Sequence, residues 1–252
     1  MATIDLNADL GEGFGRWSLT DDDALLAVVT SANVACGFHA GDPSTIRRVC
    51  DVAVAAGVSI GAQVSYRDLA GFGRRAMDVP PDELADEITY QIGALSVFAV
   101  AAGDRVRYVK PHGALYHRVV RDPAQAEAVV AGIQRAAEDL TVLGFPGSEF
   151  LRAAVAAGLP VVGEAFADRA YGPDGALVSR RQEGAVLIDG SAVVAQALRL
   201  ATAGEVVTTG GDVLEVDARS LCLHGDTPGA AGLAAMVRDA LLAGGVTVAP
   251  FA

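Results

Sequence analysis

The sequence predicts an α/β fold: an irregular (β/α) barrel of the TIM type, with about seven parallel strands, in one domain over residues 1–252. Apolar runs of four to eight residues alternate with helical stretches, which is typical of βαβ units and a parallel sheet. The runs are apolar on both faces, as expected for strands buried on both sides. Polar residues follow nearly every run, which favours a barrel over an open sheet with one switch point.

Seven apolar runs are expected to form the strands of the barrel. They are Thr3–Ala8, Val29–Ala35, Val58–Val64, Val106–Lys110, Thr141–Phe145, Pro160–Glu164 and Ser220–His224. Two insertions interrupt this order of elements. A Gly/Arg-rich loop, Arg67–Val79, follows the third run, and Val206–Val216 has the pattern of a β-hairpin around Gly210 and Gly211.

Six helices are expected between these runs. They are Asp42–Ala56, Pro81–Ala102, Asp122–Asp139, Ser148–Ala157, Ser191–Ala203 and Pro228–Ala243. The second has the clearest start, because proline and the acids Asp82 and Glu83 suit the free donors and the dipole of a helix N-terminus. Its apolar residues recur at helical spacing, at Leu84, Ile88, Ile92 and Leu95.

Composition excludes several classes of protein. The chain is 52% hydrophobic with a mean hydropathy of +0.36, so it can bury a large core, yet no apolar run reaches the roughly 18 residues of a membrane span. Its net charge of −12 argues against nucleic acid and anionic membranes as partners. The three cysteines are an odd number without C-x-x-C spacing, so no disulfide framework is expected. The first ten residues lack a basic segment, which predicts a cytoplasmic protein.

Lys110 is the only lysine, beside eighteen arginines. Arginine keeps its charge, whereas the pKa of lysine moves readily, so this position has a specific chemical role. Two roles are open for Lys110: binding a phosphoryl or carboxylate group, or donating a proton with a lowered pKa. His112 stands two residues later, between Pro111 and Gly113, and is a candidate acid/base or ligand.

The first and second strand ends carry further candidates. Alternation along the first strand places Asp5, Asn7 and Asp9 on one face, and Glu12 follows closely. Clustered carboxylates raise one another's pKa, which suits a general acid/base pair or a cation site. After the second strand, His39 stands between two glycines and is the next candidate. Further polar residues at strand ends are Asn33, Asp42, Tyr66, Arg74, Arg75, Glu164, Asp168, Arg169, His224 and Asp226.

Five of these residues have competing interpretations. Asp42 precedes Pro43, which indicates a helix cap rather than a catalytic acid. Arg74 and Arg75 in their Gly-rich loop suit an anion clamp or a flexible surface equally. His224 and Asp226 flank a glycine and suit a His–carboxylate pair or two metal ligands. The sequence contains no Walker loop and no GxGxxG fingerprint.

Six segments together resemble the LamB/YcsF family, whose members are A subunits of prokaryotic 5-oxoprolinase. They are Asp5–Glu12, Ser31–Pro43, Gly71–Arg75, Lys110–Tyr116, Phe166–Arg169 and His224–Asp226. The resemblance spans the chain and implies a barrel like that of glycoside hydrolases and deacetylases. It implies ATP-dependent opening of the lactam of 5-oxo-L-proline to L-glutamate, with ATP and Mg²⁺ as cofactors and subunits B and C as partners. Many members have histidine where this chain has Gln63, so no metal role is assigned to that position.

Under this hypothesis, Asp9 or Glu12 is the base, His39 and His112 are acid/base or orienting groups, and Lys110 is an electrostatic clamp. The residues expected to bind substrate are Asn7, Asn33, Tyr66, Arg74, Arg75, Glu164, Asp168, Arg169, His224 and Asp226.

Two alternatives remain open. One is a stand-alone metal-dependent hydrolase or deacetylase that acts on a carbohydrate or an N-acyl amide. Its ligands would come from Asp9, His39, His112, His224 and Asp226. The other is a non-catalytic subunit that binds substrate and docks on its partners.

Overall fold

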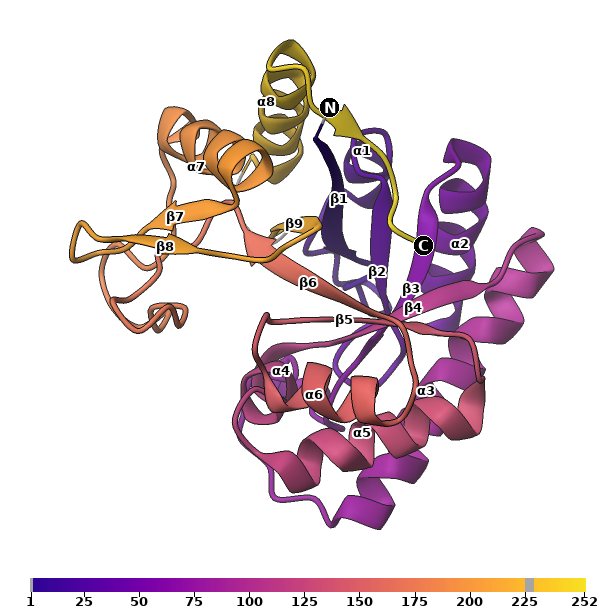
Figure 1. The fold of residues 1–252 in the computed structure, drawn as a ribbon. Helices are drawn as coiled ribbons and strands as arrows, with labels where there is room; N and C mark the ends of the chain where they lie inside the picture. Colours follow the sequence, from indigo (N-terminus) through magenta and orange to yellow (C-terminus); the bar gives the residue numbers. More distant parts are fainter. Residues whose placement is uncertain (1, 225–228) are drawn as a thin grey trace.

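The computed structural model describes residues 2–224 and 229–252 (Figure 1). The strands are β1 (Thr3–Leu10), β2 (Ser31–Ala35), β3 (Ser59–Val64), β4 (Val106–Pro111), β5 (Thr141–Gly144), β6 (Val161–Phe166), β7 (Glu205–Val207), β8 (Val213–Glu215), β9 (Ser220–Leu223) and β10 (Thr247–Val248). The helices are α1 (Asp22–Leu26), α2 (Pro43–Ala56), α3 (Pro81–Ala102), α4 (Gly113–Val119), α5 (Pro123–Ala136), α6 (Glu149–Ala156), α7 (Gly190–Ala203) and α8 (Ala230–Ala243).

The seven predicted barrel strands and the six predicted helices are confirmed, with ends that differ by a few residues. The predicted start of the last helix, Pro228, lies outside the described residues. The sequence analysis missed α1, α4 and β10, which contain 5, 7 and 2 residues. Elements this short do not complete the repeat of apolar residues on which such predictions depend.

Seven parallel strands close into a barrel. β1 pairs with β2 on one side and with β9 on the other, and the order continues through β3, β4, β5 and β6 back to β9. This arrangement confirms the predicted TIM-type barrel of about seven strands. Neighbouring strands run in the same direction, with Asp9 beside Asn33 and Asn7 beside Cys222. The polar residues that follow the strands therefore meet at one end of the barrel.

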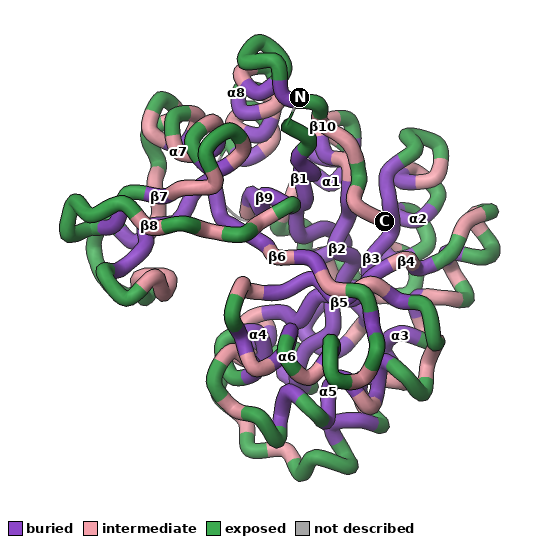
Figure 2. Tube along the Cα trace, viewed as in Figure 1, coloured by how far each residue is buried: buried purple, intermediate pink, exposed green. Residues whose placement is uncertain are grey.

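The strands form the buried centre of the molecule, and exposed residues lie on the outer turns of the helices and in the loops (Figure 2). In α3 the predicted apolar residues Leu84, Ile88 and Ile92 are buried, and each contributes about 1.5–3 kcal/mol. Gly132 of α5 allows close packing against α3, because a Cβ there would lie 2.5 Å from the Ala85 carbonyl oxygen. Replacing Gly132 would therefore push the two helices apart.

Asp42 caps α2, as predicted. Its Oδ1 accepts from the backbone N–H of Ser44 at 2.9 Å and of Thr45 at 3.3 Å. Its Oδ2 accepts from the Thr45 hydroxyl at 2.7 Å and from the Gly15 N–H at 3.0 Å. The Thr45 hydroxyl and these backbone donors lower the pKa of Asp42 to about 2. This residue therefore holds the helix start and the preceding loop rather than taking part in chemistry.

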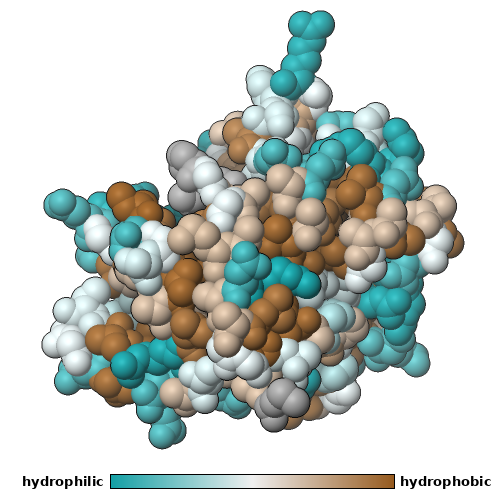
Figure 3. Space-filling view, turned by 90° about the horizontal axis from the view of Figure 1, so that it is seen from above, coloured by the Kyte–Doolittle hydropathy of each residue, from teal (hydrophilic) through white to brown (hydrophobic). Residues whose placement is uncertain are grey.

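The predicted hairpin is confirmed as the antiparallel pair β7–β8, which projects to one side of the barrel (Figure 1). Thr209 at its tip donates its N–H to the Tyr171 carbonyl at 2.8 Å, which fixes the hairpin to the loop after β6. On the face shown in Figure 3, hydrophobic side chains form patches among hydrophilic ones. Within the described part of the chain, no helix combines the length and the apolar character that crossing a bilayer requires.

Asp5 of β1 carries a buried carboxyl group whose protonation affects folding. Its Oδ1 accepts from the hydroxyls of Thr30 and Ser31, each at 2.6 Å, and its Oδ2 accepts from the Ser220 hydroxyl. Burial outweighs these donors and raises the pKa of Asp5 from 3.8 to about 6. The folded protein therefore keeps a proton that the unfolded chain has already lost between these pH values.

Asp5 is expected to make the protein less stable as pH rises from about 4 to about 6. A carboxyl group whose pKa is raised by folding stabilises the fold fully at pH values below its pKa in the unfolded chain. That contribution is lost as the pH rises through its pKa in the folded protein. The difference between a pKa of 3.8 and one of about 6 corresponds to ~3 kcal/mol of folding free energy. Urea unfolding at pH 4.5 and 7 should show Asp5→Asn gaining stability relative to the native chain at the higher pH. An equal difference at both pH values would contradict this account, and exposed Asp51→Asn is the control.

Candidate active site

Lys110 lies inside the barrel near the carboxyl end of β4 and is buried. Its ammonium is 2.6 Å from Glu164 Oε1 on β6 and donates to Asn7 Oδ1 at 3.1 Å and Asp9 Oδ1 at 3.3 Å. It also donates to the Cys222 sulfur at 3.2 Å. Burial alone would lower the pKa of Lys110, but the carboxylates of Asp9 and Glu164 help to raise it well above its usual value. The alternative of a proton donor with a lowered pKa is therefore wrong, and Lys110 is a fixed cation.

Two asparagines hold the groups around this cation. Asn33 Nδ2 donates to Asn7 Oδ1 at 2.7 Å and to Asp9 Oδ1 at 2.9 Å. Asn33 Oδ1 accepts from the Tyr108 hydroxyl at 2.7 Å. The Tyr108 ring lies against Gly61 of β3, where a Cβ would meet it at 2.1 Å, so glycine is required there. The only two asparagines of the chain thus orient Asp9 and Lys110 from inside the barrel.

Asp9 is an ionised carboxylate rather than a carboxylic acid. Burial would raise its pKa, but the charge of Lys110 beside it lowers that pKa well below its usual value. The prediction that clustered acids raise one another's pKa is therefore wrong for Asp9, although the pKa of the more deeply placed Asp5 is raised. Asp9 is thus negatively charged at the pocket and partners Lys110.

His39 and His112 stack face to face, with ring centroids 4.0 Å apart and planes inclined by 12°. The side-chain amide of Gln63 links them, with Oε1 3.1 Å from His39 Nε2 and Nε2 3.0 Å from His112 Nδ1. His112 Nε2 lies 3.1 Å from the Phe72 carbonyl oxygen. Gly73 (φ +66°) passes close to both histidines, and a Cβ there would lie 3.0 Å from His112 Cδ2 and 3.0 Å from His39 Cβ. The Gly-rich loop after β3 therefore encloses the histidine pair.

Burial lowers the pKa of His39 well below its usual value, and the nearby His112 adds to this effect. His39 is thus neutral at physiological pH. It is 1% exposed, lies behind His112, and is not among the residues that line the pocket. Its predicted acid/base role remains a prediction, and contact with substrate would have to go through His112.

Glu12 completes a cluster that includes both histidines. Its Oε1 is 3.6 Å from His39 Nε2 and 3.5 Å from His112 Nδ1. Among the described residues, this group alone has His, Cys, Asp or Glu ligand atoms close enough together for one ion. The predicted ligand set was Asp9, His39, His112, His224 and Asp226. Among the described residues Glu12 joins the two histidines, whereas His224 pairs with Asp168 elsewhere in the pocket. Asp226 lies outside the described residues, so its part of the ligand set stays a prediction.

His224 and Asp168 form a second histidine–carboxylate unit. His224 Nδ1 lies 3.0 Å from Asp168 Oδ1 and 2.9 Å from Oδ2, and its backbone N–H donates to Oδ2 at 3.2 Å. The Phe166 ring stacks on the imidazole at 5.6 Å between centroids. Burial would raise the pKa of Asp168, but the charge of His224 and its hydrogen bonds lower it. Asp168 thus stays ionised. Because it holds Nδ1 of His224, the other ring nitrogen, Nε2, faces away from the carboxylate.

A pocket of about 590 Å³ opens above Lys110 and Asp9, which is within the ~300–1,000 Å³ range of small-molecule sites. His112, His117 and His224 line it together with five arginines. These are Arg74, Arg121, Arg169, Arg180 and Arg181. The protein as a whole has a net charge of −12, so this excess of cations is local and favours an anionic ligand.

Other predicted binding residues hold the structure together instead. Arg169 donates from Nε to the Ala185 carbonyl at 3.2 Å and from Nη2 to the Val178 carbonyl at 2.6 Å, so it secures the loop that carries Arg180 and Arg181. Tyr66 donates its hydroxyl to Gln125 Oε1 at 2.9 Å. Arg75 Nε donates to Asp68 Oδ1 at 2.8 Å. Neither Tyr66 nor Arg75 lines the pocket, so the prediction that they contact substrate is corrected.

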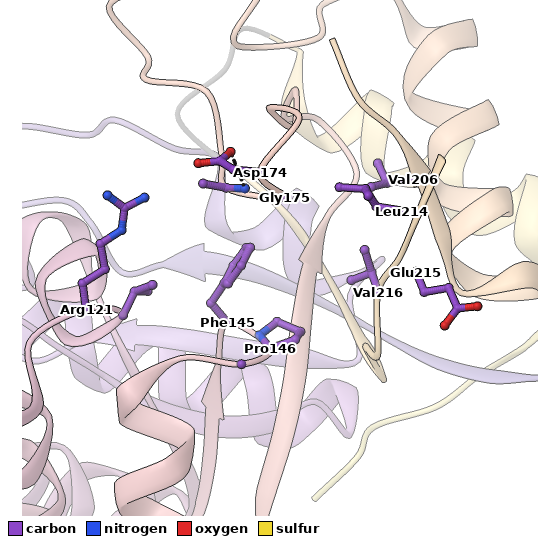
Figure 4. A pocket seen from close by; sticks show the side chains of 12 residues that line it. Arg121, Phe145, Pro146, Asp174, Gly175, Val206, Leu214, Glu215 and Val216 are labelled. Carbon is purple, nitrogen blue, oxygen red and sulfur yellow. Dashed lines mark hydrogen bonds between the residues drawn. The ribbon is translucent and has the colours of Figure 1, made fainter. Parts of the chain in front are cut away.

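A smaller cavity of about 320 Å³ adjoins this pocket (Figure 4). Val206, Leu214 and Val216 of the hairpin region form one wall, and Arg121 and Phe145 lie opposite them (Figure 4). Arg121 and Phe145 line the larger pocket as well. The two cavities therefore share part of their walls, and the predicted hairpin contributes to the wall of the smaller one.

Sequence reasoning missed several residues of the site. They are Gln63, Cys222 and Tyr108. These residues could not be predicted because their polar atoms contact residues of other strands. Residue type and spacing along one strand do not indicate such contacts. The position of Gln63 at the end of β3 was the available signal.

Comparison with known proteins identifies the family of this chain. A model of the LamB/YcsF family matches residues 4–252. The chain belongs to the LamB/YcsF family. Relatives named as the A subunit of 5-oxoprolinase are 67% identical over 249 residues in Streptomyces coelicolor and 58% identical over 251 residues in Mycolicibacterium paratuberculosis. The alignments cover 99% and 100% of this chain, respectively, and 100% of each relative.

Solved structures agree with the family assignment. The crystal structure of a lactam utilization protein from Thermus thermophilus superposes with a TM-score of 0.94 at 40% identity, over 99% of this chain and 100% of that one. A peptidoglycan N-acetylglucosamine deacetylase domain from Eubacterium rectale gives a TM-score of 0.52 at 11% identity, over 100% of this chain and 89% of that one. The second likeness shows only that this family member shares the fold of deacetylases.

Proposed function

We propose that this chain is the A subunit of a 5-oxoprolinase and hydrolyses the lactam bond of 5-oxo-L-proline to give L-glutamate. The observation that carries the proposal is one pocket in which a His–Asp pair, a fixed lysine cation and several arginines surround space for a small anionic substrate. The names of the 5-oxoprolinase relatives support it. Those names designate one lettered subunit, which indicates a complex, and we propose subunits B and C as its partners.

The pocket residues suit the parts of the substrate. Arg180 and Arg181 at the mouth of the pocket would bind the carboxylate. The Lys110 ammonium would stabilise negative charge that develops on the lactam oxygen as water adds. His224, held by Asp168, would take a proton from that water and return it to the ring nitrogen as the carbon–nitrogen bond breaks. Opening the ring consumes one water, and the product carries a new carboxylate and an ammonium group.

We propose ATP with Mg²⁺ as the cofactor of the complex, and part of the pocket fits such a group. The arginines suit phosphoryl oxygens, and Asp9 is the carboxylate at the pocket that is placed to meet an accompanying Mg²⁺. When bound, ATP would supply a phosphoryl group that activates the lactam oxygen, and that group would leave as inorganic phosphate with the use of a second water. No phosphate-binding loop of the Walker type occurs in the sequence, so any contribution of this chain to nucleotide binding would come from side chains.

The proposal is tested by measuring glutamate formation from 5-oxo-L-proline. The chain is assayed alone and mixed with its B and C subunits, each with and without ATP. Glutamate that forms only in the full mixture with ATP would support the proposal. Absence of glutamate in every mixture of folded, associated proteins would contradict it.

The double variant Arg180→Ala/Arg181→Ala is expected to raise KM for 5-oxo-L-proline about 10–100-fold while the fold remains intact. Charged hydrogen bonds to a carboxylate contribute about 1.5–3 kcal/mol, and both side chains are exposed at the mouth of the pocket. Steady-state kinetics of the complex provide the measurement. Arg135→Ala is the control, because Arg135 pairs with Asp86 on the outer surface at 2.6 Å. An unchanged KM in the double variant would remove these arginines from substrate binding.

A further inference from the structure

The hydrogen bonds of the histidine pair can hold only one arrangement of protons while both rings are neutral. A carbonyl oxygen only accepts, so His112 Nε2, 3.1 Å from the Phe72 carbonyl, must carry a hydrogen. His112 Nδ1 is then an acceptor, and it receives the Gln63 amide N–H at 3.0 Å. The amide oxygen of Gln63 consequently faces His39 Nε2 at 3.1 Å, so that nitrogen must donate. One backbone carbonyl thus determines the orientation of Gln63 and the tautomers of both histidines.

The same cluster has the composition of a metal centre, which the deacetylase-like fold would imply. A histidine that binds a metal usually donates a hydrogen bond from its other ring nitrogen. His112 meets this condition, because Nε2 donates to Phe72 and Nδ1 faces Glu12 at 3.5 Å. His39 does not. If its Nε2 bound an ion, the proton would move to Nδ1, which is buried without a hydrogen-bond partner among residues 2–224 and 229–252.

The Gln63 amide also occupies both nitrogens that an ion would need. His39 Nε2 and His112 Nδ1 are the nitrogens that approach Glu12, at 3.6 and 3.5 Å, and Gln63 lies within hydrogen-bond distance of each. Binding an ion here would break both hydrogen bonds and leave a buried imidazole N–H unsatisfied, which costs about 1–3 kcal/mol. The residues present therefore do not fit a metal ion.

We propose that Gln63 is a positioning residue that replaces a metal ion in this cluster. Its amide fixes His39 as an Nε2 donor and His112 as an Nδ1 acceptor, and it keeps both rings neutral beside the pocket. Lys110 then remains the buried cation next to Asp9. This inference does not depend on the substrate of the enzyme, so it stands or fails separately from the proposed function.

The tautomers can be observed directly by ¹⁵N NMR of the imidazole nitrogens in the native chain and in Gln63→Glu. In the native chain, we expect both histidines to be neutral and protonated on Nε2. A carboxylate at position 63 only accepts hydrogen bonds, so Gln63→Glu should convert His112 to the doubly protonated cation with little change in shape. The variant Gln134→Glu, at an exposed position, should leave both signals unchanged. A native His39 protonated on Nδ1, or a His112 that stays neutral in Gln63→Glu, would overturn the proposal.

Zinc titration by calorimetry provides the second test. We expect no stoichiometric, tight zinc site in the native chain at the cluster. Gln63→His replaces the bridging amide by a third imidazole beside Glu12, and its zinc affinity should exceed that of the native chain by at least about tenfold. Gln134→His, which adds a histidine on the surface, is the matched control. Tight zinc binding by the native chain that Glu12→Gln removes would overturn the proposal, as would equal affinities of native chain and Gln63→His.

Discussion

Replacing Lys110 by methionine is expected to abolish lactam hydrolysis and to destabilise the barrel by about 3–5 kcal/mol. The ammonium lies 2.6 Å from Glu164 and 3.3 Å from Asp9, and all three side chains are buried. Its removal leaves two buried carboxylates without their cation, which is the costly way to break a buried ion pair. Urea unfolding of the chain and glutamate formation by the complex measure the two effects.

A companion variant separates stability from catalysis. Lys110→Met/Glu164→Gln removes one of the two orphaned charges and should recover part of the lost stability, because a neutral amide costs less to bury than an unpaired carboxylate. It should not recover activity, since the cation that we propose to face the lactam oxygen is still missing. If the double variant regained activity, or if Lys110→Met alone kept it, Lys110 would have only a structural role.

The surroundings of the Lys110 ammonium also explain why arginine cannot replace lysine at this position. Asn7 and Asp9 of β1 and Cys222 of β9 approach one compact ammonium at 3.1–3.3 Å. A planar guanidinium donates in a fork and needs more space than this arrangement leaves. Lys110→Arg is therefore expected to behave as a disruptive change, although it conserves charge.

The fold could be predicted from the sequence because each piece of information was local. Apolar runs without a polar face indicate strands buried on both sides, and Asp42 before Pro43 marks a helix start. Closure of the barrel followed from polar residues after nearly every strand. The short α1 and β10 were missed, because one or two turns of helix and a two-residue strand contain no repeat.

The candidate site was predictable only in part. Scarcity identified Lys110, Asn7 and Asn33, and these do meet inside the barrel. Their pairing could not be predicted, since it depends on which strands are neighbours and on their register. The partner of His224 illustrates this limit. Sequence proximity indicated Asp226, whereas the structure brings Asp168 to within 2.9 Å from the end of another strand.

The charge of the pocket is another property that composition concealed. Averaged over the chain, the protein is acidic, and an anionic ligand would be repelled from most of its surface. The loop after β6 concentrates Arg180 and Arg181 at the pocket, and the buried Arg169 holds that loop through two backbone carbonyls. An anionic substrate is thus directed to the one described pocket where lysine, arginine and histidine side chains converge.

Replacing His224 by glutamine is expected to lower kcat of the complex by about 10²–10⁴-fold with little change in KM. This range is typical when a positioned acid or base is removed. Asp168→Asn should lower kcat less and shift the acidic limb of the pH–rate profile to lower pH, because the protonated imidazole loses its neighbouring carboxylate. Full pH profiles of kcat/KM for both variants provide the measurement. His117→Gln, which changes another histidine of the pocket, is the matched control and should retain nearly native rates.

The His224–Asp168 pair should also affect the stability of the fold. Its contribution should change with pH in the direction opposite to that of Asp5. The pKa of Asp168 is lowered in the folded state, so its stabilising contribution is present at neutral pH and is lost as pH falls through that lowered value. Asp168→Asn should therefore be less stable than the native chain near pH 7, and the difference should shrink in acid. If both His224→Gln and Asp168→Asn kept native kcat while showing this stability pattern, the pair would be structural. The proton transfers would then have to be assigned to another titratable group that lines the pocket, and Asp9 and His112 would be the first to test.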